Sequence, residues 1–333
     1  MKVIILLAGY GTRMRPHTWS RPKPLLKVAG NTVVGHLLDL MAPITSDEVI
    51  FVVGYRGEQI EAWIRERYPH LDARFVVQED AKGQAHAVWL CRDYLDEQQV
   101  VVAFGDGIIE ADYPALPDPA ADGVLMVKEV EDPRRFGVAA LDEKGFVRQL
   151  IEKPAGDEHR LALAGVNWFR DGRQLCAALD HVIEEGRQTL GEHFLADALQ
   201  VMLEAGARLR TQEVITWVDA GTPQALLQTN ARLLSAGYAS DEALERSFVD
   251  GFTVVPPVYI HPSAQIDAAV IGPYASIDAE VEISNAVVRN SIIDTGAQVR
   301  DCVLQGALVG VRAQVSGRGV SLFVGDDSWV ELG

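Results

Sequence analysis

The sequence opens with MKVIILLAGYGTRMRPHTWSRPKPLLK, residues 1–27, and this stretch decides how the rest of the chain is interpreted. It contains a continuous run of β-branched residues and leucine, 3–7, which is typical of a strand covered on both faces in a parallel sheet. Gly9 and Gly11 follow without a pause and let backbone N–H groups approach an anion closely. Arg13 adds a guanidinium fork that suits phosphate. The stretch therefore predicts a buried strand that leads into a phosphate-binding loop.

The spacing of the two glycines matches neither the dinucleotide fingerprint nor the Walker loop, because Gly11 is followed by Thr-Arg rather than by Gly-Lys-Ser or Gly-Lys-Thr. A plain glycine turn after a core strand is the structural alternative. The whole string, 7–16 with Thr18 and 22–26, resembles the signature of the sugar-phosphate nucleotidyltransferases, the pyrophosphorylases that make nucleotide sugars. This resemblance implies a catalytic role for Arg13 and Lys23. It implies nucleotide binding by five residues of the loop, Leu7, Ala8, Gly9, Gly11 and Thr12.

Composition narrows the class of protein. The chain has 333 residues, enough for two domains, with 48% hydrophobic and 23% charged residues, as in ordinary globular proteins. A net charge of −17 argues against nucleic acid or an acidic membrane surface as a partner. No apolar run approaches the ~18 residues of a membrane span, and the start does not look like a signal peptide, so we expect a cytoplasmic protein. Three scattered cysteines without a CxxC pair predict neither a disulfide framework nor a zinc site.

Helical and strand-like patterns alternate through the first part of the chain. Helical spacing occurs at 33–41, 57–67 and 84–93, and strand-like runs occur at 48–53, 74–77 and 100–104. Such alternation predicts a Rossmann-like α/β fold, a mixed and mostly parallel sheet with helices on both faces. Sites in these sheets lie beyond the carboxyl ends of the strands. Gly9, Gln78 and Asp106 all fall at such positions.

Two aspartates follow strand-like runs. Asp106 lies between two glycines after the strand at 100–104, and Asp219 precedes a Gly-Thr-Pro that starts a helix. Either one alone could be a turn residue that caps the next segment. The family resemblance implies that both positions coordinate magnesium. We therefore expect Asp106 and Asp219 to hold Mg²⁺.

The segment 78–87, QEDAKGQAHA, is similar to the family's base-reading loop. The resemblance implies that Gln78 pairs with the nucleobase and that Gly83 lets the base lie on the backbone. An amide can pair with the adjacent donor and acceptor of uracil or thymine, which favours UTP or dTTP over a purine nucleotide. An exposed polar residue at a strand end is the alternative for Gln78. His86, alone among alanines, is interpreted as a packing or solvated residue rather than a catalytic one.

Three later segments, 136–139, 151–154 and 164–169, resemble the sugar-phosphate half of the same family. The resemblance implies that Gly137 lies under the sugar, that Glu152 takes sugar hydroxyls and that Lys153 takes the phosphate, as a catalytic residue. It places Asn167 in a strand that lines the pocket. Asn167 stands where an aromatic residue is frequent, and the Leu-Gly-Glu at 190–192 lacks an arginine common in thymidylyltransferases. The identity of the sugar is therefore left open.

Beyond Pro256-Pro257 the pattern changes to apolar residues every five or six positions, from Ile260 to Val315. This period fits hexapeptide turns stacked as a parallel β-helix. It resembles the left-handed β-helix appended to several nucleotidyltransferases, including long-form glucose-1-phosphate thymidylyltransferases. We expect about three coils, closed by Phe323 and Trp329. The predicted domains are a catalytic domain at 1–235, a helical linker at 236–255 and the β-helix at 256–333.

Together these patterns predict a Mg²⁺-dependent enzyme that joins a sugar 1-phosphate to a nucleoside triphosphate, dTTP or UTP, and releases pyrophosphate. The β-helix is expected to associate copies into a homo-oligomer. Two alternatives remain. Added acetyltransferase activity would need a catalytic histidine, and His261 is the only histidine after residue 250. A non-catalytic regulatory subunit of the same architecture would tend to lose the phosphate and metal residues, and all of these are present here.

Overall fold

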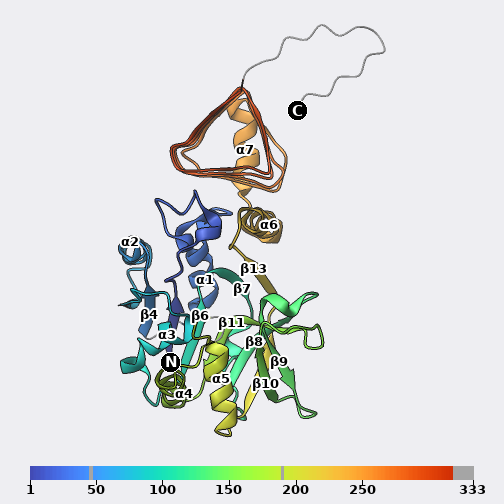
Figure 1. Cartoon of the computed structure of the whole chain (residues 1–333). Helices are drawn as coiled ribbons and strands as arrows, with labels where there is room; N and C mark the ends of the chain where they lie inside the picture. Colours follow the sequence, from blue (N-terminus) through green and yellow to red (C-terminus); the bar gives the residue numbers. More distant parts are fainter. Residues whose placement is uncertain (45–47, 189–190, 318–333) are drawn as a thin grey trace. The chain divides into compact units, whose positions relative to one another are not determined.

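The structure is a computed structural model of the whole chain, and it describes residues 1–44, 48–188 and 191–317. The chain divides into two compact units. The first comprises Met1–Leu26 and Asn31–Leu226, and the second comprises Lys27–Gly30 and the chain from Leu227 onward. Figure 1 shows an α/β sheet in the first unit and a triangular prism in the second. None of the helices in the described ranges is long and apolar enough to cross a bilayer.

The first unit is built on one sheet, which has nine strands among the described residues. Its main path runs β10-β9-β11-β6-β1-β4-β5, and β8 pairs with β11 and β12. β6, β1, β4 and β5 are parallel neighbours, whereas β11 runs antiparallel to β6, β8 and β9. The strands are β1 (Lys2–Leu6), β3 (Asn31–Thr32), β4 (Glu48–Val53), β5 (Asp72–Val77), β6 (Val100–Phe104), β8 (Gly123–Glu129), β9 (Gly137–Leu141), β10 (Val147–Glu152), β11 (Leu161–Phe169) and β12 (Leu209–Glu213), with β3 outside this sheet. The predicted mixed, Rossmann-like sheet is confirmed.

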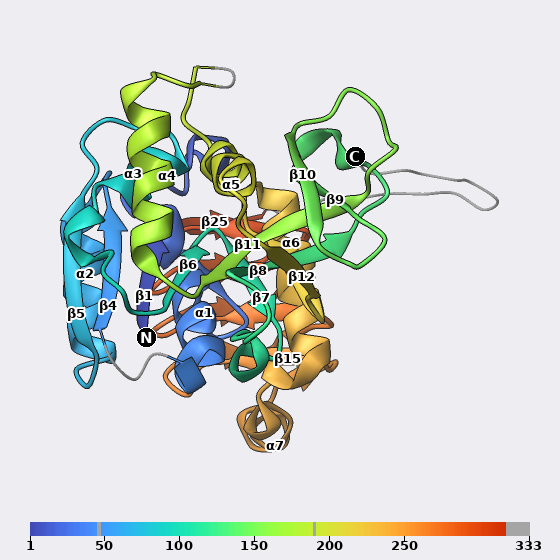
Figure 2. The same cartoon turned by 90° about the horizontal axis from the view of Figure 1, so that it is seen from below.

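Helices cover both faces of this sheet because its strands are apolar on both sides. Val3 and Ile5 face a core that includes α1 (Val33–Met41) and α2 (Gly57–Arg67). Ile4 faces the opposite core, which includes α3 (Gln84–Trp89), α4 (Gly172–Glu184) and α5 (Leu195–Glu204). Figure 2 shows α1 on one side of β1 and β6 and the helices α3, α4 and α5 on the other.

The predicted bounds of α1, α2, β4 and β6 are confirmed. The third helix is shorter than expected. It ends at Trp89 rather than at 93, because Cys91 leaves the helical region and the next turn, Arg92–Tyr94, is a 3-10 helix.

The second unit is a left-handed parallel β-helix with three four-stranded sheets among its described residues. The predicted apolar repeat is confirmed, since Ile277, Val288 and Val299 are fully buried inside the prism. Its strands are β2 (Lys27–Val28), β14 (Thr253–Val254), β15 (Val258–Ile260), β16 (Gln265–Asp267), β17 (Val270–Ile271), β18 (Ala275–Ile277), β19 (Glu282–Ser284), β20 (Val287–Arg289), β21 (Ile292–Ile293), β22 (Gln298–Arg300), β23 (Val303–Gln305), β24 (Leu308–Val309) and β25 (Gln314–Ser316), with β2 outside these three sheets. Several corners use the left-handed backbone region, as at Asn285 and Asn290. Asparagine tolerates this region better than most residues.

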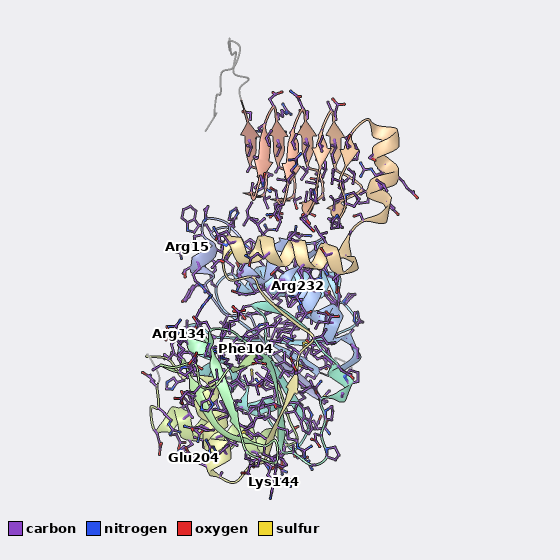
Figure 3. The ribbon with its side chains drawn as sticks, turned by 90° about the vertical axis from the view of Figure 1, so that its right-hand side faces the viewer. Arg15, Phe104, Arg134, Lys144, Glu204 and Arg232 are labelled. Carbon is purple, nitrogen blue, oxygen red and sulfur yellow. The ribbon has the colours of Figure 1, made fainter. Side chains whose placement is uncertain are left out.

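The described part of the prism has four coils, not about three. The sequence prediction began after Pro256-Pro257, but β14 lies before this pair and pairs with β17. Val254 and Phe252 are buried in the prism core without belonging to the regular repeat. Helix α7 (Asp241–Asp250) packs at the end of the prism that carries β14 and β15, as Figure 3 shows. The expected closing residues Phe323 and Trp329 lie outside the described residues.

Helix α6 (Pro223–Leu233) begins in the first unit and ends in the second. A π-helical turn, Leu234–Tyr238, follows it and contains Gly237 with φ +104°. The helix expected to start at the Gly-Thr-Pro is confirmed as α6, and a second helix, α7 (Asp241–Asp250), lies within the predicted linker at 236–255.

Candidate active site

A glycine fixes the path of the loop that follows β1. Gly11 has φ +62°, and a Cβ on it would lie 3.0 Å from the Cβ of Lys23 and 3.1 Å from Cγ2 of Thr18. A larger residue would strain the backbone and crowd both neighbours. The Thr18 hydroxyl also donates a hydrogen bond to the Gly11 carbonyl at 2.8 Å. The loop is therefore packed against the segment that carries Lys23.

The other predicted nucleotide-binding residues of this loop differ in whether their side chain or only their backbone is accessible. Leu7 is buried, and its side chain occupies the space that a Cβ on Gly105 would need, so only its backbone faces the loop. A Cβ on Gly9 would meet no atom of the described residues within 4 Å. Thr12 is exposed and starts a short 3-10 turn, Thr12–Met14. The loop thus presents an open backbone at Gly9.

Four charged side chains gather beside this loop. Lys23 is buried, and its Nζ lies 3.3 Å from Oδ2 of Asp106 and 4.0 Å from Oδ1 of Asp219. A Cβ on Gly221 would lie 2.8 Å from both Nη2 of Arg13 and Oδ1 of Asp219. The structure therefore brings together the two predicted metal ligands and the two predicted catalytic cations of the loop region.

Strand pairing explains why the two aspartates meet although 113 positions separate them in the sequence. Two short strands, β7 (Gly107–Glu110) and β13 (Thr216–Asp219), pair antiparallel with Asp219 opposite Gly107. This register sets Asp219 directly beside Asp106. The Gly221 N–H then donates to Oδ1 of Asp219 at 2.7 Å and fixes the carboxylate.

The aspartate pair suits a hard divalent cation. Both carboxylates are largely exposed, with 63% of the Asp106 side chain and 46% of the Asp219 side chain accessible. In the part of the chain that the structure describes, no three or more His, Cys, Asp or Glu side chains gather as a complete metal cage. Mg²⁺ is usually bound by one or two carboxylates, with water and phosphate oxygens completing its shell. The residues present fit that mode of binding.

Gln78 lies where three strand ends meet. Its N–H donates to the Val53 carbonyl at 2.8 Å, so it continues the pairing of β5 with β4. A Cβ on Gly54 would lie 2.9 Å from the carbonyl oxygen of Ala8 and 3.1 Å from that of Gln78. This close approach places the start of the predicted phosphate-binding loop beside the predicted base-reading residue.

The Gln78 side chain is buried and has two polar neighbours. Its Nε2 lies 3.1 Å from the Gly83 carbonyl oxygen and 3.0 Å from Nδ1 of His86. Gly83 itself has φ +99°, and a Cβ on it would clash with the backbone of His193. The predicted pair of Gln78 and Gly83 therefore forms one hydrogen-bonded unit, to which the structure adds His86.

Gly137, Glu152 and Lys153 form a second group at the start of β9 and the end of β10, with Lys153 directly after β10. Gly137 is paired with Glu152, and a Cβ on Gly137 would lie 2.7 Å from Oε2 of Glu152. Glycine therefore leaves the room that this carboxylate occupies. Burial raises the pKa of Glu152 from 4.5 to about 6; Lys153 opposes the shift, and Asp197 and Glu192 add to it.

Sequence reasoning missed the segment that joins the two groups. The His193 N–H donates to the Lys82 carbonyl, and the His193 carbonyl accepts from Ala85, both at 2.9 Å. The next residue, Phe194, has its ring centroid 4.8 Å from Nζ of Lys153. One short segment before α5 thus touches both the loop of Gln78 and the lysine of the second group. No local pattern in the sequence predicts these contacts.

Asn167 is not among the exposed groups of either cluster. It is 1% exposed in β11, where its neighbours on the adjacent strands are Val102 and Leu125. Its Oδ1 is buried and makes no hydrogen bond with any described residue. Its predicted role at the sugar stays a prediction.

Comparisons with known proteins agree with this architecture. A family model described as Nucleotidyl transferase matches residues 2–236. The low-salt glycan biosynthesis nucleotidyltransferase Agl11 of Haloferax volcanii is 28% identical over 100% of both chains. The glucose-1-phosphate thymidylyltransferase of Streptomyces griseus is 29% identical and covers 95% of this chain and 94% of its own. A Bacillus anthracis protein described as a glucose-1-phosphate thymidylyltransferase, solved with sucrose, matches with a TM-score of 0.60 and 27% identity, covering 70% of this chain and 94% of that one.

Proposed function

Because the chain belongs to the nucleotidyl transferase family, we propose that it joins a sugar 1-phosphate to a pyrimidine nucleoside triphosphate and releases pyrophosphate. A phosphate oxygen of the sugar 1-phosphate attacks the α-phosphorus in line. The bond from the α-phosphorus to its bridging oxygen breaks, and that oxygen leaves with the β- and γ-phosphates. The sugar phosphate has a second pKa of about 6 and is mostly dianionic at neutral pH, so no general base is required.

The main difficulty of this reaction is to bring two polyanions together, so catalysis should consist of positioning and charge neutralisation. We assign Lys23 to the α-phosphate and Arg13 to the leaving pyrophosphate. Lys153 would hold the sugar phosphate in line. Asp106 and Asp219 would hold Mg²⁺, which supplies positive charge to the triphosphate when bound.

The observation that carries the proposal is the ion cluster of Lys23 with Asp106 and Asp219. The buried ammonium lies 3.3 Å and 4.0 Å from two exposed carboxylates, which supports a phosphate-binding role for the cation and a metal-binding role for the carboxylates. Phosphoryl-transfer sites need both features within reach of one phosphate group. The loop after β1, which has an open backbone at Gly9, reaches the same cluster, because the Arg13 side chain at its end lies beside Asp219.

We assign the nucleotide as dTTP or UTP. The Gln78 amide supports a pyrimidine, and its backbone lies near the Ala8 carbonyl at the start of the loop. The thymidylyltransferase from Streptomyces griseus supports dTTP in particular. Gly137 and Glu152 would contact the sugar, because the carboxylate occupies the space that glycine leaves. Glucose 1-phosphate is the sugar phosphate named in that relative, and we propose it as the first candidate.

Pyrophosphate release tests this proposal directly. Full-length protein with Mg²⁺ is supplied with dTTP, UTP, CTP, GTP or ATP, each crossed with the 1-phosphates of glucose, galactose, mannose and N-acetylglucosamine. We expect release only when a pyrimidine nucleotide and a sugar 1-phosphate are both present. Asp106→Asn should abolish most of it, whereas Asp72→Asn, at an exposed carboxylate of β5, should leave it unchanged. If no pair of substrates gives pyrophosphate release, the non-catalytic regulatory alternative is favoured.

We propose that the β-helix unit serves self-association rather than catalysis. The parallel coils form a regular, rigid surface, and the described residues give no support to acyl transfer, since the His261 ring bonds the hydroxyl of its neighbour Ser263 at 2.9 Å. Sedimentation of the full chain should give a mass of two or more copies. A monomer at micromolar concentration would contradict this proposal.

A further inference from the structure

The hydrogen bonds of the Gln78 side chain define its orientation. The Gly83 carbonyl can only accept a hydrogen bond, so the nitrogen of the Gln78 amide, not its oxygen, faces it at 3.1 Å. The same nitrogen lies 3.0 Å from Nδ1 of His86. Both N–H groups of the amide are then used within the protein, and Nδ1 of His86 must be an acceptor. His86 is therefore neutral in this arrangement, with its proton on Nε2.

We propose that His86 is the positioning residue of the base-reading amide: together with the Gly83 carbonyl it holds Gln78 so that only the amide oxygen is presented to the nucleobase. This inference rests on the proposed function and deepens it. The oxygen Oε1 reads a donor on the base, which for uracil and thymine is the N3–H. Cytosine carries a lone pair at this position and would face the oxygen with a second acceptor.

This arrangement changes the recognition predicted from the sequence. A freely rotating amide offers a donor and an acceptor side by side, and it can turn over to fit other base edges. While the proton of His86 stays on Nε2, an amide whose nitrogen is occupied twice cannot turn over without losing two hydrogen bonds. Selectivity for the pyrimidine N3–H therefore depends on His86, which itself makes no contact with the base.

The surroundings of His86 favour its neutral form. Burial lowers the pKa of His86 below its usual value of 6.5, and Lys82 and His193 lower it further, while Asp80 opposes them. The His86 ring stacks on Trp89 at 6.0 Å, and Trp89 is held by Asp180 of α4 and by Arg92. When His86 is protonated, its Nδ1–H faces an amide N–H. The Gln78 amide then bonds either the Gly83 carbonyl or His86 but not both, so neither orientation is favoured. Its oxygen is no longer fixed toward the base as the pH falls.

Nucleotide affinity, measured by calorimetry on the full chain, tests the inference. UTP and dTTP are each compared with their 3-methyl derivatives, which lack the N3–H but carry the same phosphates. The readout is the ratio of the two dissociation constants, because phosphate titration cancels in it. For the wild type we expect a ratio of about tenfold at pH 7.5, as expected for one hydrogen bond, and a lower ratio at pH 5.5, because His86 gains its proton only below its usual pKa of 6.5.

Variants distinguish a positioning role of His86 from a general loss of folding or of nucleotide binding. His86→Ala should show the low ratio at both pH values, and His86→Gln, which keeps an acceptor oxygen but does not titrate, should keep the high ratio at both. The matched control His181→Ala, at a histidine of α4, should behave as the wild type. A ratio that neither pH nor His86→Ala changes, in protein that binds UTP, would overturn this inference alone. A wild type that binds none of these nucleotides would overturn the proposed function as well.

Discussion

Glu152→Gln should make the protein more stable at neutral pH and impair its use of the sugar phosphate. Burial raises the pKa of Glu152 from 4.5 to about 6, so the folded state favours the neutral carboxyl. The ionised form therefore destabilises the fold. This penalty is absent below pH 4.5, grows between 4.5 and about 6, and is complete above that range.

The size of the effect follows from the same pKa. The difference between 4.5 and about 6 corresponds to about 2 kcal/mol in the free energy of unfolding. The side chain is only partly buried, so solvent screening reduces this to about 1 kcal/mol. Glutamine removes the charge and keeps the shape. We expect the melting temperature at pH 7.5 to rise by about 2–4 °C, with no gain at pH 4.5.

Thermal unfolding at pH 7.5 and pH 4.5, followed by tryptophan fluorescence, measures this difference. Glu143→Gln, at an exposed carboxylate of the loop after β9, is the matched control and should change nothing. At pH 7.5 the KM for the sugar 1-phosphate should rise about tenfold in Glu152→Gln, because an ionised acceptor is replaced by a neutral one. An equal gain in stability at both pH values, or none at pH 7.5, would refute the reasoning from burial.

Three further changes have defined outcomes. Lys23→Ala removes the cation between the two aspartates, so turnover should fall by about 100-fold or more while circular dichroism stays unchanged; turnover within threefold of the wild type would exclude a catalytic role. Gly83→Ala places a Cβ against the backbone of His193 at φ +99°, so nucleotide affinity by calorimetry should drop about tenfold, and unchanged binding would mean that the loop of Gln78 is not used. Asn230→Ala removes a fully buried amide that bonds three groups of the second unit, so urea unfolding should show that unit destabilised by about 2–4 kcal/mol; a loss below 0.5 kcal/mol would contradict the assigned hydrogen bonds.

Local patterns were enough to predict most elements of the fold. α1 and α2 carry clear helical spacing, and β4 and β6 are short apolar runs bounded by turn residues, so their bounds could be read directly. The apolar repeat of the β-helix is equally local. Its first coil escaped prediction because β14 is a two-residue strand before a proline pair, where no repeat had yet begun.

The candidate site was predicted in part, because its residues follow strand ends but its distances depend on tertiary pairing. Glycine-flanked Asp106 and Asp219 could be chosen from the sequence, whereas their proximity results from the register of β7 with β13. The hydrogen bond from Gln78 to His86 joins a strand end to a helix and has no local signature. The burial of Asn167 between two apolar neighbours likewise depends on which strands flank β11.

The fate of labelled phosphates tests the central claim most directly. The full-length protein is given Mg²⁺, a sugar 1-phosphate and dTTP or UTP that carries radioactive phosphorus at either the α- or the γ-position, and the products are separated. Attack on the α-phosphorus predicts that the α-label appears in the nucleotide sugar and that the γ-label leaves as pyrophosphate. Transfer of the γ-label to the sugar, or its release as inorganic phosphate alone, would contradict the mechanism.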